Sequence, residues 1–95
     1  MFLILVHYRK PWETVEPHVE EHKRYLHRFY YSNELLFSGP QLSQTGGVIL
    51  GRFPSEDQVW EMVKGDPFYV RGLARYDVIP FRATMAAPDF HSLLE

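Results

Sequence analysis

The 95-residue chain contains no cysteine. This absence excludes disulfides, thiolate nucleophiles, iron–sulfur clusters and cysteine-type zinc sites. A basic excess is also missing, since 10 Lys and Arg stand against 12 Asp and Glu, for a net charge of −2. Dedicated nucleic-acid-binding proteins usually carry a strong basic excess or a basic stripe, so we expect no nucleic-acid partner.

Long hydrophobic runs are absent as well. The apolar N-terminal run Met1–Val6 ends before His7 and has no basic segment in front of it. It is too short for a signal-peptide core or a membrane span, so we expect a cytoplasmic protein with no membrane partner. Internal repeats, low-complexity tracts and glycine-rich phosphate loops are missing too, because Thr45–Gly47 lacks the lysine of such a loop. We therefore expect no cofactor.

The composition that remains is that of one globular domain. Hydrophobic residues make up 45% and charged residues 23% of the chain, which argues against disorder. A chain of this length buries a limited share of its surface when it folds alone. The aromatic content of 16% partly compensates, and it indicates that some rings are buried against a partner chain.

Residue patterns predict four strands and two helices. The predicted strands are Phe2–Tyr8, Glu34–Ser38, Gly47–Phe53 and Leu73–Arg82, and the predicted helices are Thr14–Tyr31 and Glu56–Lys64, followed by a short helical turn from Asp66 to Val70. The first strand is continuously apolar, which predicts burial of both its faces. Gly39-Pro40 is expected to close the second strand, which pairs with the third as a hairpin with a long connection.

Capping residues and one apolar stripe define the helices. Thr14 is the expected N-cap of the first helix, and Ser55 is the expected N-cap of the second. Asp66 followed by Pro67 is typical of a fresh helix start. Five positions of the first helix follow 4-3-4-3 spacing and form one apolar stripe. They are Val15, Val19, His22, Leu26 and Phe29.

The predicted element order is β-α-β-β-α-β. This order indicates an α+β, ferredoxin-like fold, in which a four-stranded antiparallel sheet carries both helices on one face. The other face has no helix to cover it, yet the strands carry apolar residues in both registers. An exposed apolar sheet face marks an interface, so we expect a homodimer in which two sheets pack face to face.

Three groups of short motifs connect the sequence to a known family. They are Glu21–Leu26; Ser38-Gly39-Pro40 with Thr45-Gly46-Gly47; and Gly65-Asp66-Pro67-Phe68 with Gly72-Leu73 and Ile79-Pro80-Phe81. In this order and spacing the chain resembles the YCII-related (YciI-like) family of the dimeric α+β barrel superfamily. The resemblance places the domain at residues 1–83, and the tail at residues 84–95 extends past the usual end of the family.

The resemblance implies several properties beyond the fold. It implies a homodimer, a cleft beside the sheet and a His–Asp pair, carried here by His22 and Asp66. Most members have no known function. Some relatives are linked to dehydrochlorination of chlorinated aromatics, and superfamily neighbours include muconolactone isomerases and cofactor-free monooxygenases.

The two residues of this pair each have a functional and a structural interpretation. His22 is a candidate general acid or base, because imidazole titrates near working pH, but it also fits a packed core histidine. Asp66 is a candidate orienting group for His22, and it also fits a plain helix cap. The two roles of Asp66 are compatible, because a carboxylate has two oxygens that can each accept more than one hydrogen bond.

Three further residues are candidates for substrate binding. Ser38 is expected to line the same cleft, although nothing near it in the sequence indicates an activated nucleophile, and a turn role also fits. Tyr8 and Phe68 are candidate cleft walls, or ordinary core residues.

A metal site is the weaker interpretation of the histidines. His18 and His22 stand at i and i+4, which places them on one helix face, and His7 is the only obvious third ligand. Two ligands form a loose pattern, so we expect no metal.

The leading hypothesis is a cofactor-independent enzyme that performs proton-transfer chemistry on a small cyclic or aromatic molecule. The reaction class is isomerisation, or elimination such as dehydrochlorination, with His22 moving the proton and Asp66 orienting it. The alternative is a non-catalytic dimeric module that binds a small molecule or assists a partner enzyme. A cofactor-free monooxygenase is a third hypothesis, which requires a substrate that itself activates oxygen.

Overall fold

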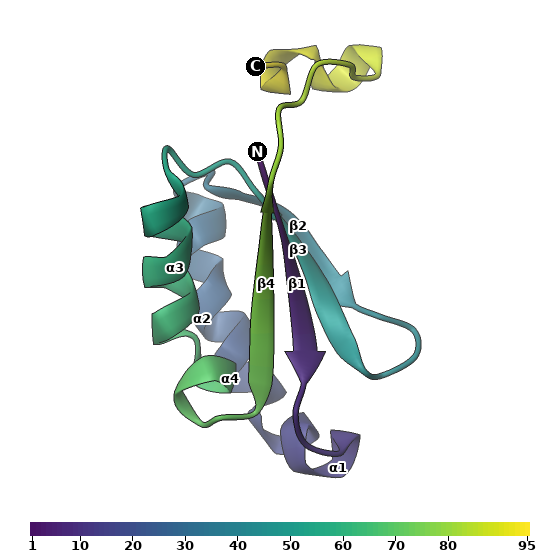
Figure 1. Ribbon diagram of the computed structural model, residues 1–95, viewed down its shortest axis with the longest axis vertical. Helices are drawn as coiled ribbons and strands as arrows, with labels where there is room; N and C mark the ends of the chain where they lie inside the picture. Colours follow the sequence, from purple (N-terminus) through teal and green to yellow (C-terminus); the bar gives the residue numbers. More distant parts are fainter.

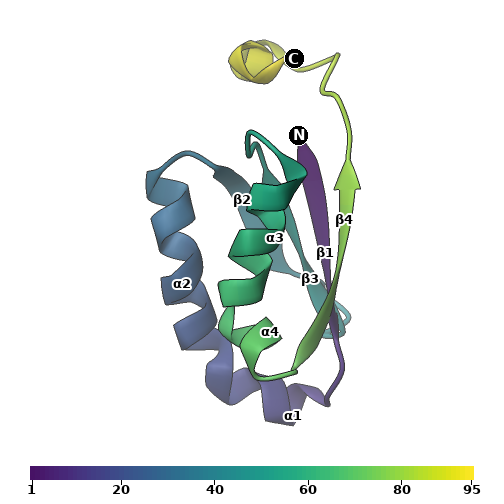
Figure 2. The ribbon, with the colours of Figure 1, turned by 60° about the vertical axis from the view of Figure 1, so that its left-hand side comes forward.

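The computed structural model describes all 95 residues and has the predicted α+β fold (Figure 1). Its elements are β1 (Phe2–Tyr8), α1 (Trp12–Val15), η1 (Glu16–His18), α2 (Val19–Tyr31), β2 (Leu35–Pro40), β3 (Gly46–Gly51), α3 (Glu56–Gly65), α4 (Pro67–Val70), β4 (Ala74–Pro80) and η2 (Pro88–Leu93). The four strands form one antiparallel sheet in the order β2-β3-β1-β4. α2 and α3 lie side by side on one face of this sheet (Figure 2).

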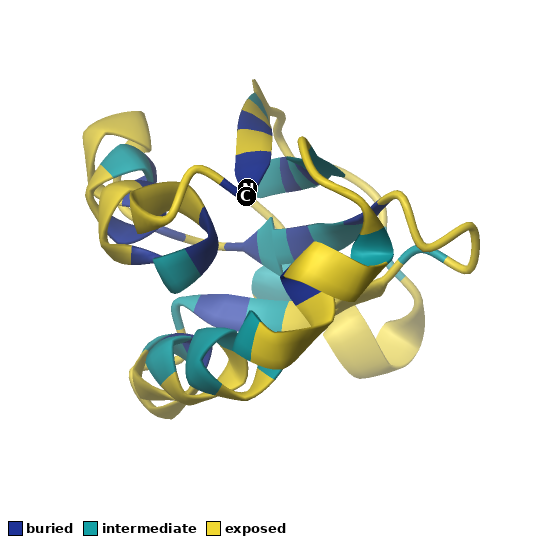
Figure 3. Ribbon diagram, turned by 90° about the horizontal axis from the view of Figure 1, so that it is seen from below, coloured by how far each residue is buried: buried dark blue, intermediate teal, exposed yellow.

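The core lies between these helices and the sheet (Figure 3). Ile4 and Val6 of β1 point into it and are 0% and 3% exposed. Burial of such a side chain contributes roughly 1.5–3 kcal/mol. On the helices, the stripe residues Val15 and Leu26 are buried, while α3 contributes Val59, Met62 and Val63.

The opposite face of the sheet has no second layer in the single chain. Leu3 and Leu5 of β1 alternate with the core residues and are half-buried, so the prediction that both faces of this strand are buried holds here for one face only. The register places Leu3 beside Leu50 and Leu5 beside Val48, on the same side of the sheet. These residues, together with Ile79 of β4 and Phe37 of β2, form what we call the open face.

The first helix begins earlier than predicted. It starts at Trp12 after Pro11 rather than at Thr14, and the amide of Thr14 already donates to the Pro11 carbonyl at 2.9 Å. Pro17 lies within the short 3-10 segment η1 that separates α1 from α2. Because proline has no N–H, this turn loses little by departing from the α-helical pattern.

The second strand also departs from the prediction. Gly39-Pro40 does not close it, since β2 runs to Pro40, which pairs with Gly47. β2 is an edge strand, where a missing N–H costs no ladder bond on its solvent side. The third strand ends earlier than predicted, at Gly51, so Phe53 enters the core from the following loop.

The expected caps of α3 and α4 are present. The Ser55 hydroxyl accepts from the Gln58 amide at 3.4 Å, and the Asp66 carboxylate accepts from the Phe68 amide at 2.9 Å. Pro67 occupies the first turn of α4, where its fixed φ suits a helix start. α3 therefore passes into α4 at Gly65-Asp66 with almost no linker.

The last residues leave the sheet after β4 and project beyond its end (Figure 1). The carboxylate of Glu95 accepts from the N-terminal ammonium of Met1 at 2.9 and 3.0 Å and from the Ala83 amide at 3.0 Å. The Phe90 ring of η2 meets the Phe37 ring edge-on, with 6.3 Å between centroids. These contacts fold the tail back toward the N-terminal end of β1.

Gly65 provides a test of how closely α2 and α3 pack. A Cβ at this position would lie 2.4 Å from the Tyr25 hydroxyl oxygen, and that hydroxyl donates to the Met62 carbonyl at 2.8 Å. We expect Gly65→Ala to lower the free energy of unfolding by about 1–3 kcal/mol in urea denaturation, because overpacking displaces the Tyr25 ring.

Gly39→Ala is the matched control, since a Cβ there meets nothing within 4 Å. Its effect should stay below about 1 kcal/mol. Equal unfolding midpoints for the two variants would contradict the tight packing at Gly65.

Candidate functional site

His22 and Asp66 are 44 residues apart in the sequence and adjacent in the structure. His22 Nδ1 lies 2.8 Å from Asp66 Oδ1. The stripe of α2 that packs on the sheet carries His22, while Asp66 sits at the junction of α3 and α4. Asp66 is 1% exposed and the His22 side chain is 15% exposed, so the contact lies at the inner edge of the core.

The Asp66 carboxylate holds two elements at once. Its Oδ1 accepts from His22 and from the Phe68 backbone amide at 2.9 Å. An ionised carboxylate only accepts, so Nδ1 of His22 carries the proton of this bond. In the neutral ring the lone pair is therefore on Nε2, the nitrogen that a general base uses.

Phe68 fixes the plane of the imidazole. The two rings stack with 4.0 Å between centroids and an angle of 3°, and Phe68 is itself 2% exposed. Stacking on a buried ring, together with the bond to Asp66, restricts rotation of the His22 side chain. Such restraint is what a positioned acid or base requires.

A cavity of about 390 Å³ lies between α2 and the sheet, and His22 lines it. Tyr8 and Phe68 form part of its wall, and Ser38 contributes a hydroxyl, so four of the five candidate residues meet here. Asp66 does not line the cavity and stands behind the imidazole. Sequence reasoning missed the other lining residues. Among them are Trp12 and Lys23, since a helix start and a solvated charge are ordinary at such positions.

The wall around Tyr8 is aromatic. The Tyr8 ring stacks on Trp12 at 5.9 Å and meets the edge of Phe68 at 5.9 Å. Burial raises the pKa of Tyr8, so its hydroxyl stays protonated and can donate at neutral pH. The wall therefore combines the apolar rings of Tyr8, Trp12 and Phe68 with the hydroxyl donor of Tyr8.

Ser38 has a hydroxyl partner and no base. It accepts a short hydrogen bond from the Tyr30 hydroxyl of α2. No histidine or carboxylate contacts Ser38, so nothing activates its oxygen as a nucleophile. The arrangement fits a polar contact on the cavity wall.

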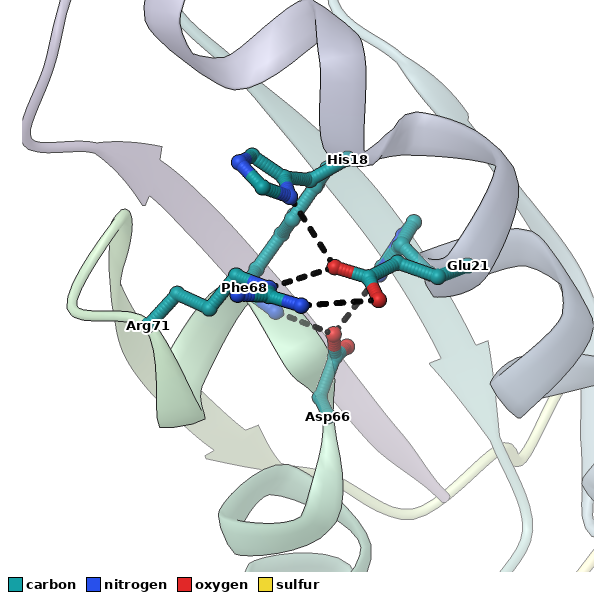
Figure 4. A network of polar contacts seen from close by, with 6 residues as sticks. His18, Glu21, Asp66, Phe68 and Arg71 are labelled. Atoms are coloured by element: carbon teal, nitrogen blue, oxygen red, sulfur yellow. Dashed lines mark hydrogen bonds and ion pairs between the residues drawn. The ribbon is translucent and has the colours of Figure 1, made fainter.

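An ion-pair network beside Asp66 ties α2 to the end of α4 (Figure 4). Arg71 donates to both oxygens of Glu21, at 2.5 and 3.2 Å, and His18 Nδ1 lies 3.0 Å from Glu21 Oε1. The Arg71 hydrogen bond holds the pKa of Glu21 below its usual value, and Glu21 raises that of Arg71. The pair spans 50 residues of sequence, and no spacing signal connects the two residues.

The three histidines considered as metal ligands do not converge. His18 pairs with Glu21 and His22 with Asp66, while His7 Nε2 lies 2.9 Å from Asp77 Oδ2. Because side chains alternate along β1, His7 faces the side of the sheet opposite to the cavity. No group of three or more histidine, aspartate or glutamate side chains could hold a metal ion.

Together the fold and the site define a class of protein: a small α+β sheet protein with a His–carboxylate pair beside an aromatic-walled cavity. The chain belongs to the YCII-related family, because the family model of the YCII-related domain matches residues 1–82. The resemblance seen in the sequence motifs is thereby confirmed.

One solved structure supports the same fold. It is 5-chloro-2-hydroxyhydroquinone dehydrochlorinase (TftG) from Burkholderia phenoliruptrix AC1100, in complex with 2,5-dihydroxybenzoquinone. The similarity has a TM-score of 0.73 at 21% identity and covers 87% of this chain and 95% of the other. The comparison with curated proteins gave no significant match. None of the helices is long and apolar enough to span a membrane.

Substitution of Asp66 tests its structural role. Asp66→Ala removes the acceptor for the Phe68 amide, and we expect it to lower the free energy of unfolding by about 0.5–2 kcal/mol. Asp66→Asn should cost less, because an amide oxygen still caps α4. Asp89→Asn in the exposed tail is the control and should leave the urea midpoint unchanged. If Asp66→Ala were as stable as the native chain, the capping role would be wrong.

Proposed function

We propose that the protein is a cofactor-independent enzyme that moves a proton on a small cyclic or aromatic molecule, with His22 as acid or base and Asp66 as its orienting partner. One observation carries the proposal: Nδ1 of His22 is held by a buried carboxylate, while the same ring lines a cavity. A histidine oriented on one side and exposed to a ligand space on the other has the geometry of general acid–base catalysis.

The cavity indicates the kind of substrate. Its volume of about 390 Å³ lies in the range of small-molecule sites. Tyr8 and Phe68 favour a flat ring, and the Ser38 hydroxyl and the Lys23 ammonium offer partners for oxygen substituents. The similar structure TftG, a dehydrochlorinase bound to 2,5-dihydroxybenzoquinone, adds support for a ring of this kind.

The reaction class is isomerisation or elimination, such as dehydrochlorination. In an elimination, Nε2 of His22 takes a proton from the substrate, and the electron pair left behind forms the new π bond. Chloride leaves with the electron pair of the broken C–Cl bond, so the balance is one proton on His22 and one chloride ion, without an oxidant or reductant. The Asp66 carboxylate stabilises the imidazolium formed in this step.

A non-catalytic binding module is the second candidate. It is favoured by the second contact of Asp66 Oδ1 with the Phe68 amide, because a cap explains the buried carboxylate without any reaction. The two candidates differ in whether a bound molecule is converted.

Replacement of His22 separates the two candidates. With 5-chloro-2-hydroxyhydroquinone as the probe substrate, we expect His22→Gln to reduce chloride release about 10²–10⁴-fold, because the proton acceptor is lost. His27→Gln, on the exposed side of α2, is the matched control and should release chloride like the native chain. Equal rates for His22→Gln and the native chain would refute the role of His22. Binding of 2,5-dihydroxybenzoquinone by a native chain that releases no chloride would support the binding module.

We also infer that the chain forms a homodimer through the open face of the sheet. The half-buried side chains Leu3, Leu5, Val48 and Leu50 lie side by side there, and Ile79 is 44% exposed. Covering these apolar groups with a second copy removes them from water, which stabilises the assembly.

Light scattering at micromolar concentration should give close to twice the mass of one chain. Leu5→Lys places a charge at the centre of the open face and should shift the protein to monomer. Leu42→Lys, in the fully exposed β2–β3 loop, should remain dimeric. A folded native chain that scatters as a monomer would rule out this interface.

A further inference from the structure

Two buried side-chain oxygen atoms have no hydrogen-bond partner within the chain. They are Oδ2 of Asp66 and the hydroxyl of Tyr76, in residues that are 1% and 6% exposed. An unpaired polar atom in the core is costly, so native proteins rarely leave such atoms without a partner.

The two atoms are chemically complementary. Tyr76 lies on β4, and its ring packs against that of Tyr69 on α4 with 6.2 Å between centroids; Asp66 caps the start of the same short helix. Burial first, and then the negative charge of the nearby Asp66 carboxylate, raise the pKa of Tyr76. The phenol therefore keeps its proton and can donate it, and a carboxylate oxygen can accept such a bond.

We propose that Tyr76 is a positioning residue of the site, which donates its hydroxyl proton to Asp66 Oδ2 and so holds the carboxylate against His22. The inference rests on the proposed function of the His22–Asp66 pair. With this bond the carboxylate has three donors: His22 and the Phe68 amide on Oδ1, and Tyr76 on Oδ2. Tyr76 does not line the cavity, so it acts through Asp66 rather than on a substrate.

The third donor changes the strength of the His22 contact. The Tyr76 bond fixes Oδ2 and thereby keeps Oδ1 turned toward His22 Nδ1. Removal of the hydroxyl leaves Oδ2 without a donor, so the carboxylate can turn and the bond from His22 Nδ1 weakens. A residue that only fills space in the core has no such effect.

Tyr25→Phe is the matched control for Tyr76→Phe. The Tyr25 hydroxyl belongs to α2, lies against Gly65 and donates to the Met62 carbonyl at 2.8 Å. Each variant thus deletes one phenol oxygen. The Tyr25 oxygen already has an acceptor in the Met62 carbonyl, whereas the Tyr76 oxygen has none within the chain.

The direct test is proton NMR of the His22 Nδ1–H, assigned by its absence in His22→Gln. We expect this resonance to move upfield in Tyr76→Phe, because the bond to Asp66 weakens, and to keep its position in Tyr25→Phe. An unchanged resonance in Tyr76→Phe, or equal shifts in both variants, would overturn the proposal.

A double-mutant cycle tests the same contact through stability. If Tyr76 donates to Asp66, Tyr76→Phe should lower the folding equilibrium constant at least fivefold less in an Asp66→Ala background than in the native chain. Tyr25→Phe should have the same effect in both backgrounds within about twofold, which is the usual limit of additivity. Additive behaviour of Tyr76→Phe and Asp66→Ala would overturn the proposal even where one variant is weakly stable.

Turnover separates this inference from the proposed function. With 5-chloro-2-hydroxyhydroquinone, we expect Tyr76→Phe to lower kcat about two- to tenfold, the worth of one hydrogen bond, with KM unchanged. Tyr25→Phe should change neither constant. Chloride release that needs His22 but is equal in the two phenylalanine variants would overturn the positioning role and leave the proposed function standing. The expected NMR shift and coupling in a chain that releases no chloride would uphold the Tyr76 contact and refute the function.

Discussion

The buried carboxylate of Asp66 is the contact on which the site depends. A charge that is 1% exposed must have hydrogen-bond donors, because its transfer out of water is otherwise very costly. The donors come from two places, His22 on α2 and the amide of Phe68 at the start of α4. The same atom therefore starts one helix and fixes the side chain of another, so that local capping and tertiary packing cannot be separated.

Contacts around this carboxylate make the site rigid. Phe68 stacks on the imidazole, and Arg71 clamps Glu21. Both contacts join α2 to the α3–α4 segment, and neither lies in a long loop. The cavity is bounded by this rigid joint and by the sheet, which suits a reaction in which one nitrogen must be held near one substrate atom.

The two faces of the sheet differ in what they carry. The face under α2 and α3 carries the cavity, whereas the open face carries Leu3, Leu5 and their neighbours on β3. Because side chains alternate along a strand, β1 contributes to both layers at once. The proposed homodimer uses the open face, whereas His22, Tyr8 and Phe68 line the cavity on the other face.

Much of the fold could be predicted from local chemistry. Ser55 and Asp66-Pro67 predict where their helices begin, the apolar stripe predicts the buried side of α2, and the motifs around His22 and Asp66 indicate the family.

Predictions from local signals were wrong where the position of an element in the tertiary structure decides its bounds. Thr14 is a reasonable cap, yet the helix starts at Trp12, and Pro40 continues a strand because β2 lies at an edge of the sheet.

Contacts between distant residues carry no spacing signal at all. Three such features follow only from how the helices α1, α2 and α4 pack against the sheet. They are the ion pair of Arg71 with Glu21, the places of Trp12 and Lys23 at the cavity, and the unpaired oxygens of Asp66 and Tyr76. The sequence by itself determined which elements form and which residue types they carry, because caps and periodicity act over a few residues. Only the tertiary structure decided which of these residues meet, because that depends on how separate elements pack.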